Sequence, residues 1–403
     1  MTRFTVALTP CPDYETSQVR GAVRRLLSAI PGALEGLPYG ARVFLKPNLL
    51  MPRTPDLCVT THPEVVSAVG LEVRGRELHP VIGDSPGGPF TPAHLSRLYA
   101  ETAMAEAAAA CCGELNLDTS TAEVEGRGLS VPRRFTFCRA MVESAAIINL
   151  CKLKTHGLTG LTGAVKNLFG CVPGLLKTEY HMTQPTVEAF SDILVDIARV
   201  LAPRLTIMDA VDAMEGAGPS HGTPRRVGLL LAAADPFALD YAVARMLDAK
   251  PEGFTTFAAA LRRGYGPQDD GQLEVLWLPP GDEGPVALTG DDGVRLLRGL
   301  APESFRLLEP ENLSGLHGRG IVRRVLRTVQ PWLRTRPVLT PGLCTGCGTC
   351  ARVCPAKALV LKSRRPKIDL RRCIRCYCCH ELCPHGALRI GRPLGNRLLY
   401  RRS

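Results

Sequence analysis

The chain has 403 residues, enough for two or three domains, and its hydrophobic fraction of 45% fits a globular protein with a sizeable core. Sixteen cysteines without the rhythm of a disulfide framework favour a reducing compartment, so we expect a cytoplasmic protein. The N-terminus has no signal core, and the most apolar stretch, Val227 to Ala234, is too short to cross a bilayer. The composition therefore argues against secreted and membrane-spanning proteins.

Charge is unevenly distributed along the chain. Residues 319–403 contain 20 Lys and Arg but two acidic residues, a net charge of +18. The whole chain carries +11, so residues 1–318 carry −7. Because the same segment holds two cysteine runs that could bind metal clusters, this asymmetry predicts docking to an acidic redox partner protein; the alternative is that the basic residues only neutralise the charge of such clusters and their thiolates. A nucleic-acid partner is disfavoured because no stacking aromatics are interleaved with the basic residues.

Short apolar runs alternate with helical stretches from Phe4 to about Leu278, which predicts an α/β fold: a mostly parallel sheet with flanking helices. The expected strands are Phe4–Leu8, Arg42–Leu45, Val81–Gly83, Ala145–Leu150, Leu205–Met208 and Val227–Leu231. The expected helices include Ser17–Ile30, Pro63–Val69, Ala93–Ala110, Thr186–Leu201 and Pro236–Leu247. Residues 281–313 have the composition of an irregular end to this domain.

Four segments follow from this pattern. An α/β domain is expected at 1–303, and a linker with a basic amphipathic helix at 304–335. Residues 336–392 contain two cysteine runs with the spacing of bacterial ferredoxins, so a small α+β ferredoxin-like domain is expected there, followed by a basic tail at 393–403. We expect the linker helix to pack as a connector, with peripheral contact to a membrane surface as the alternative.

Two cysteine runs near the C-terminus share the spacing C-x2-C-x2-C-x3-C-P, which is that of bacterial two-cluster ferredoxins. In this spacing the fourth cysteine of each run ligates the other cluster. Two 4Fe-4S clusters are therefore expected, one on Cys344, Cys347, Cys350 and Cys383, the other on Cys373, Cys376, Cys379 and Cys354. Structural zinc is the weaker alternative, because it does not call for two identical runs each closed by proline. Cys378 falls outside the spacing and is predicted not to be a ligand.

Polar residues gather where the expected strands end, the edge at which open α/β sheets bind ligands. Lys46 and Asn48 follow one strand, and Asp84 follows another. The threonines before Pro63 would cap a helix, and the adjacent His62 is a candidate binding residue. Asp209 and Glu215 are candidates to hold a metal or to orient a lysine, whereas Asp235 fits a helix cap.

The densest group follows strand Ala145–Leu150 and contains Lys152, Lys154, His156, Lys166 and Asn167. Lysines, a histidine and a glycine-rich turn into a helix make a donor-rich pocket that suits a carboxylate or phosphate. Lysines this close depress one another's pKa, which suits proton transfer by Lys154 or His156. His181 is a further candidate, and a solvated basic loop is the alternative interpretation.

Several short motifs occur together and in order: Lys-Pro-Asn, Thr-His-Pro, Gly-Asp-Ser-Pro, Lys-Leu-Lys-Thr-His with Lys-Asn-Leu-Phe-Gly, and Asp-Pro-x-Ala-x-Asp. With them, residues 4–300 resemble the family called domain of unknown function 362, which is often fused to a C-terminal two-cluster ferredoxin module. Its core is also distantly similar to lactate racemase-type proteins, whose lysine and histidine serve a nickel-pincer cofactor. No residue for that cofactor is identified, and the Rossmann fingerprint is absent, so neither nickel nor flavin is supported.

Three functions follow from these features. The first is an iron–sulfur oxidoreductase that passes electrons to an anionic small molecule. In this function Lys46, Asn48, Lys154 and Lys166 hold the anion. The second is an electron carrier that docks to a partner and has no substrate of its own. The third is a racemase-like or nucleotide-dependent enzyme with structural clusters.

Overall fold

The computed structural model describes residues 3–127, 129, 133–184, 186–249, 253–281, 283–308 and 334–391. The expected linker helix and the basic tail at 393–403 lie outside these residues. Among the described residues, none of the helices combines the length and the apolar character that crossing a bilayer requires.

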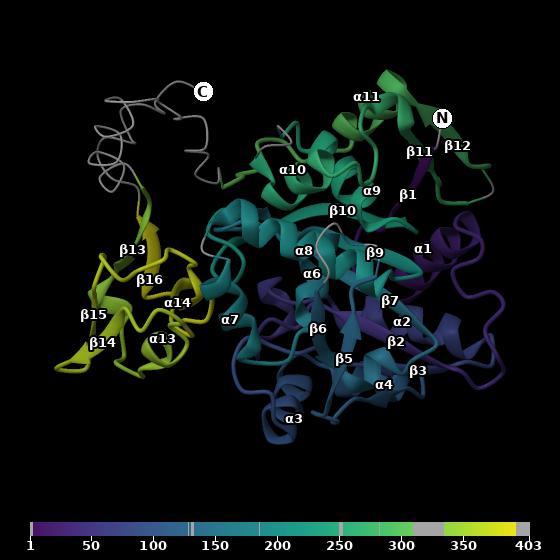
Figure 1. Cartoon of the computed structure of the whole chain (residues 1–403). Helices are drawn as coiled ribbons and strands as arrows, with labels where there is room; N and C mark the ends of the chain where they lie inside the picture. The colour runs from purple at the N-terminus through teal and green to yellow at the C-terminus, as the bar shows by residue number, and fades with distance from the viewer. Residues whose placement is uncertain are drawn as a thin grey trace.

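The described residues form one large sheet (Figure 1). Its strands are β1 (Phe4–Pro10), β2 (Arg42–Pro47), β3 (His79–Ile82), β4 (Glu114–Leu115), β7 (Ala146–His156), β8 (Gly160–Leu161), β9 (Leu205–Glu215), β10 (Thr223–Ala233), β11 (Leu273–Trp277) and β12 (Val286–Thr289). The order is β12-β11-β1-β10-β9-β7-β2-β3-β4, with β8 paired to the end of β7. A separate hairpin joins β5 (Thr121–Glu125) and β6 (Arg134–Cys138).

Most neighbouring strands are parallel, as expected. β9, β7, β2, β3 and β4 run parallel to one another, and β1 runs parallel to β11. β10 is antiparallel to both β1 and β9, and β12 is antiparallel to β11. The carboxyl ends of β2, β3 and β7 therefore meet at one edge of the sheet, which is where the predicted polar residues come together.

Helices cover both faces of the sheet. One face packs against α1 (Thr16–Ala29), α2 (Pro63–Arg74), α3 (Pro92–Glu101) and α4 (Met104–Ala110). The other packs against α6 (Gly163–Asn167), α8 (Val187–Leu201), α9 (Pro236–Met246), α10 (Thr255–Arg262) and α11 (Gly290–Gly299). Two short helices, α5 (Arg139–Val142) and α7 (Leu176–Thr183), complete the α/β part.

The six predicted strands are present, each longer than expected, and three of them are about twice the expected length or more. β7 continues to His156, β9 to Glu215, and β10 spans 223–233. The single helix expected at Ala93–Ala110 is wrong: it divides into α3 and α4, because Ala103 adopts the left-handed conformation. The irregular end expected at 281–313 is also wrong in part, since β12 and α11 form there and Leu297 is fully buried.

A small C-terminal module, residues 334–391, follows the α/β part. It contains two antiparallel pairs, β13 (Arg336–Leu339) with β16 (Leu388–Gly391) and β14 (Leu359–Lys362) with β15 (Arg365–Ile368). Two one-turn helices, α13 (Thr349–Arg352) and α14 (Cys378–Glu381), carry parts of the two cysteine runs. The module lies beside α7 and the carboxyl edge of the sheet (Figure 1).

Candidate functional site

Strand β7 carries the predicted catalytic residues in its own extended backbone, not in a loop after it. Lys152, Lys154 and His156 alternate along the strand, so their side chains leave it on the same face. All three are buried, with at most 3% of each residue exposed. The solvated basic loop considered as an alternative is therefore excluded. The same strand nevertheless delivers these side chains into different surroundings.

Lys152 belongs to a closed cluster that also contains His62. Its Nζ lies 2.8 Å from an Asp209 carboxylate oxygen and 2.8 Å from the Tyr14 hydroxyl. Tyr14 stacks on the His62 ring with 3.6 Å between centroids. His62 also caps α2 through Nδ1, which accepts the Glu64 N–H, so the expected threonine cap is wrong. Asp209 thus orients a lysine, and neither Lys152 nor His62 lines the pocket described below.

A hydrogen-bonded layer forms the floor of the pocket that is described below. It consists of Lys46, Asn48 and Asn167. Lys46 pairs with Asp84 at 2.8 Å, and both side chains are buried. The Asn167 amide oxygen accepts from Asn48 Nδ2 at 2.8 Å and from Lys46 Nζ at 3.3 Å. Gly170 is required here, because a Cβ at that position would lie 2.2 Å from Asp84 Oδ1. Lys46 is therefore committed to an internal ion pair and does not line the pocket.

Lys154 is buried without a carboxylate partner among the described residues. Its Nζ donates to Asn48 Oδ1 at 2.7 Å and to the Val59 carbonyl at 2.5 Å. Burial lowers the pKa of Lys154 to about 7. The charge of Glu381 opposes this shift, and the charges of the neighbouring lysines lower the pKa by less than burial does. Desolvation is thus the main cause, not the lysine–lysine repulsion expected from the sequence. Near neutral pH the amine is poised to gain or lose a proton.

His156 presents a proton donor to the pocket. Its Nδ1 accepts the N–H groups of Leu158 at 3.0 Å and Thr159 at 3.4 Å. Burial lowers the pKa of His156 to about 4, so the neutral ring carries its proton on Nε2. Nε2 lies 3.6 Å from Glu381 Oε2, beyond hydrogen-bond distance, and has no hydrogen-bond partner among the described residues. The hydroxyl of Thr162 is likewise buried and unpartnered in that part of the chain.

The C-terminal module closes this pocket. Glu381, at the end of α14, is 16% exposed and faces His156. Burial raises the pKa of Glu381, but the charge of Lys166 and the nearby His156 ring outweigh it and hold the pKa well below its usual range. The backbone of α14 is anchored by Ser220, which donates to the Glu381 carbonyl at 2.7 Å. His221 Nε2 lies 2.8 Å from the Cys383 carbonyl oxygen, and Leu382 packs against Gly87.

The pocket has a volume of about 840 Å³, including the part open to solvent. Its polar lining comprises Asn48, Asp84, Ser85, Lys154, His156, Thr162, Lys166, Asn167, Lys177, Thr178, His181 and Glu381. Of these, Lys177 is tied to the Ser85 carbonyl at 2.8 Å and is structural. His181 stacks on Phe190, and burial lowers its pKa to about 3, so this ring is neutral. The module contributes Val353, Cys378, Glu381 and Leu382.

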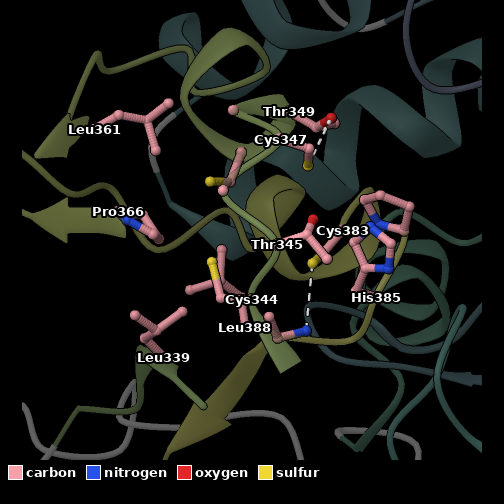
Figure 2. Close-up of a pocket in the computed structure, with 15 residues that line it drawn as sticks. Leu339, Cys344, Thr345, Cys347, Thr349, Leu361, Pro366, Cys383, His385 and Leu388 are labelled. Atoms are coloured by element: carbon pink, nitrogen blue, oxygen red, sulfur yellow. Dashed lines mark hydrogen bonds between the residues drawn. The ribbon is translucent and has the colours of Figure 1, made fainter. Parts of the chain in front are cut away.

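Four of the predicted cluster ligands surround a second, smaller hollow of about 340 Å³ (Figure 2). They are Cys344, Cys347, Cys350 and Cys383, the set predicted for one cluster. Leu339, Leu361 and Leu388 supply an apolar wall around the thiols. This donor set and lining fit a 4Fe-4S cluster, and Cys383 joins the first run although it belongs to the second.

The other four predicted ligands also lie near one another. Burial raises the pKa of Cys379, and the charges of Cys376, Cys373, Cys354 and Cys350 raise it further. Burial also raises the pKa of Cys373, with Cys376 and Cys354 as the cysteines that add to it. Cys354, from the first run, therefore lies with cysteines of the second.

Two acidic residues outside the cysteine module have structural roles. The alternative of a metal on Asp209 and Glu215 is not supported, since Glu215 pairs with Arg306 at 2.8 Å. Asp235 caps α9, as predicted.

Three important residues were missed by the sequence reasoning. Tyr14 and Thr162 carry no motif that marks them. Glu381 did carry a signal, because it is one of two acidic residues in a strongly basic segment and lies inside a cysteine run. Its role depends on how the module packs against the sheet, which spacing does not reveal.

Comparisons with known proteins agree with this architecture. Residues 43–245 match the family described as domain of unknown function (DUF362), and residues 343–387 match the 4Fe-4S dicluster domain. The chain is 35% identical over 269 residues to thylakoid-associated protein sll1697 of Synechocystis sp., which covers 65% of this chain and 80% of that protein.

Two further relatives match shorter stretches. An uncharacterized polyferredoxin-like protein of Methanocaldococcus jannaschii is 38% identical over 55 residues, which cover 10% of this chain and 33% of that protein. NADH-quinone oxidoreductase subunit I 2 of Symbiobacterium thermophilum is 34% identical over 80 residues, covering 16% of this chain and 33% of that protein. These similarities support an iron–sulfur electron-transfer role. The chain belongs to the DUF362 family and carries a C-terminal 4Fe-4S dicluster ferredoxin domain.

Proposed function

We propose that this protein is an iron–sulfur oxidoreductase that transfers electrons to an anionic small molecule held between the sheet edge and the ferredoxin module. The observation that carries the proposal is the pocket's set of uncommitted donors. His156 Nε2 and Thr162 Oγ1 are buried without partners among the described residues. Leaving such groups unsatisfied costs about 1–3 kcal/mol each, which a bound ligand would recover.

Lys166 makes the pocket suitable for an anion. It lines the cavity from α6 and forms no ion pair within 4.0 Å among the described residues, whereas Lys46 and Lys152 each have a carboxylate at 2.8 Å. The N-terminus of α6 is occupied by Asp240, whose carboxylate accepts the Ala164 N–H at 2.6 Å. Side chains, not a helix terminus, therefore supply the positive charge. A carboxylate or phosphate would accept from Lys166, Thr162 and His156.

Two 4Fe-4S clusters are part of this proposal, one on each set of four cysteines. Such clusters supply one-electron transfer when they are bound. The set containing Cys354 and Cys379 borders the substrate pocket, because their neighbours Val353 and Cys378 line it. This adjacency supports the proposal that a cluster on the second set donates electrons to a substrate in the pocket.

Lys154 is the proposed proton carrier. Its pKa of about 7 allows both protonation states near neutral pH, and its Nζ is held in place by Asn48 and Val59. His156 keeps its proton on Nε2 and is proposed to orient the substrate by donating a hydrogen bond. Lys46, Asn167 and Asp84 support these groups from below. His62 and Lys152 have no direct part in the reaction.

Anaerobic purification tests the proposal. We expect iron and sulfide for two clusters, together with a small anion that mass spectrometry identifies after acid release. Lys166→Ala and His156→Ala should lose the anion and keep the iron, whereas the exposed control Lys357→Ala should keep both. The released molecule should reoxidise the reduced clusters of the wild-type protein and not those of the pocket variants.

Some results would contradict the proposal. If wild type and pocket variants release the same molecules and reoxidise at equal rates, the pocket is not a substrate site. Nickel in stoichiometric amount would instead favour the racemase-like alternative.

A further inference from the structure

We infer that electrons reach the clusters through a basic docking face on the C-terminal module, and that this face binds an acidic electron-carrier protein. We define the docking face by Arg352 and by Lys362, Arg364 and Arg365 of the β14–β15 hairpin. The inference extends the proposed function and rests on its assignment of two clusters. It concerns how electrons arrive, whereas the pocket concerns where they go.

The two cysteine sets differ in their access to solvent. Cys347 is exposed, whereas the other seven predicted ligands are partly or fully buried. Cys347 belongs to the set around the smaller hollow (Figure 2), on a loop that borders solvent. The set with Cys354 and Cys379 borders the substrate pocket instead. This asymmetry makes the first set the outer cluster site and the second set the inner one.

The hairpin packs directly on the outer cysteine loop. Leu361 and Pro366 line the hollow next to Cys344 and Cys347 (Figure 2). A Cβ on Gly346 would lie 2.4 Å from the Arg364 carbonyl oxygen, which shows how closely the two segments approach. Arg352 NH1 donates to the Cys347 carbonyl at 3.1 Å. A protein bound to the hairpin would therefore be held close to the outer cluster site.

The surface here is strongly basic and partly apolar. Lys362, Arg364 and Arg365 are exposed, and none of them forms an ion pair among the described residues. Val360 and Leu361 are exposed by 52% and 42% beside them. Of the two acidic residues in the module, Glu381 faces the pocket. A basic rim around an apolar contact complements an acidic protein surface, and such complementarity mainly accelerates association.

A redox protein fits this surface better than a lipid bilayer. The exposed cysteine loop lies within the docking face, so a bound carrier would bring its own redox group near a cluster. With a flavodoxin as the carrier, the anionic flavin hydroquinone would give up one electron and become the neutral semiquinone, and an oxidised cluster held by Cys344, Cys347, Cys350 and Cys383 would accept that electron, with no proton exchanged. A membrane surface would use the same charges but would cover the loop without delivering an electron.

The test uses the full chain with its clusters and an acidic flavodoxin as probe. The triple variant K362E/R364E/R365E is compared with a control triple variant, R3E/R20E/R74E. The control makes the same change in net charge at exposed arginines of the α/β part. The first variant should weaken flavodoxin binding and slow cluster reduction by roughly tenfold or more at low salt. The control should lose far less, and the wild-type rate should fall steeply as salt is added.

Two further measurements complete the test. The methyl viologen radical, a cationic reductant, should reduce the hairpin variant at least as fast as wild type, which shows that its clusters are intact. Pocket variants such as Lys166→Ala should bind and accept electrons from flavodoxin normally, which separates this inference from the proposed function. Equal losses in both triple variants, or a rate independent of salt, would overturn the docking face. Vesicles containing phosphatidylglycerol that bind wild type but not the hairpin variant, with flavodoxin kinetics unchanged, would assign the face to a membrane instead.

Discussion

Lys152 and Lys154 lie two residues apart on β7, each 1% exposed, yet their surroundings lead to opposite behaviour. Lys152 meets Asp209 at 2.8 Å and the Tyr14 hydroxyl at 2.8 Å. Lys154 meets two neutral oxygens, from Asn48 and Val59. An ion pair to a carboxylate offsets the desolvation cost of a buried lysine, whereas Lys154, without such a partner among the described residues, has its pKa lowered by burial. The first region is built for stability, and the second is proposed to be built for chemistry.

The sheet irregularity between the two lysines accompanies this difference. β7 and β9 pair in regular register up to Lys152 and Asp209, after which the register shifts before Lys154. In the regular register Lys154 would pair with Val211, but after the shift it pairs with Met214 instead. The unpaired lysine then faces the pocket at the strand's end. Bulges and register shifts often re-aim side chains beside active sites.

The largest expected effect comes from breaking the Lys152 region. Asp209→Ala leaves a buried lysine charge without its partner, and we expect a loss of about 3–5 kcal/mol in the free energy of unfolding. The double variant D209A/K152M should recover much of this loss, because it removes the orphaned charge as well. Denaturant unfolding of the anaerobic protein measures both. A single variant as stable as wild type would show that the pair contributes little.

The Lys154 region should respond to pH instead. Its pKa falls from 10.5 to about 7 on folding, so between these pH values the unfolded chain binds more protons and stability rises with pH. Below about pH 7 the buried lysine is charged in the folded state as well, so folding carries the full free-energy cost of burying the charged amine. Lys154→Met should remove this penalty and flatten the pH dependence, with a stability difference on the order of a few kcal/mol at pH 6. Melting curves at pH 6 and pH 10 check the sign. Parallel curves for variant and wild type would contradict the lowered pKa.

Two threonines sharpen the comparison further. Thr61 Oγ1 accepts the Asn48 N–H at 2.9 Å and donates to the Leu150 carbonyl at 2.7 Å, whereas Thr162 Oγ1 has no partner among the described residues. Thr61→Val should destabilise the protein by about 1–3 kcal/mol, because it leaves buried groups unsatisfied. Thr162→Val should leave the stability of the ligand-free protein unchanged or slightly raise it, while weakening retention of the bound anion. Equal destabilisation by both substitutions would mean that Thr162 already has an internal role.

The smallest expected effect is at Cys378, which lines the Lys154 pocket but lies outside the ligand spacing. Cys378→Ser should retain the full iron content, whereas Cys379→Ser, one residue on, should lose iron from one cluster. Iron analysis and the visible absorption of the anaerobic proteins distinguish the two. Loss of iron from Cys378→Ser would mean that Cys378, and not Cys379, is the cluster ligand.

Much of this protein was determined by local sequence. The alternation of apolar runs and helical stretches predicted the central strands of the sheet, because each run must bury at least one face. The cysteine spacing predicted the crossed ligand sets, since a fixed number of residues limits where each thiol can reach. The glycine-rich turn into a helix predicted that Lys166 shares a donor-rich pocket with Lys154 and His156. Each of these features is encoded in the spacing of residues within one segment of the chain.

Tertiary structure alone decided which candidates share a site. Lys46, Lys152 and His62 have the same local patterns as the pocket residues, but Asp84, Asp209 and Tyr14 occupy them. These partners come from distant segments, so no spacing rule relates them. The same holds for Glu381, which reaches His156 because the ferredoxin module packs against the sheet edge. The charge of a buried group depends on every neighbour within a few ångströms, and only the folded chain assembles those neighbours.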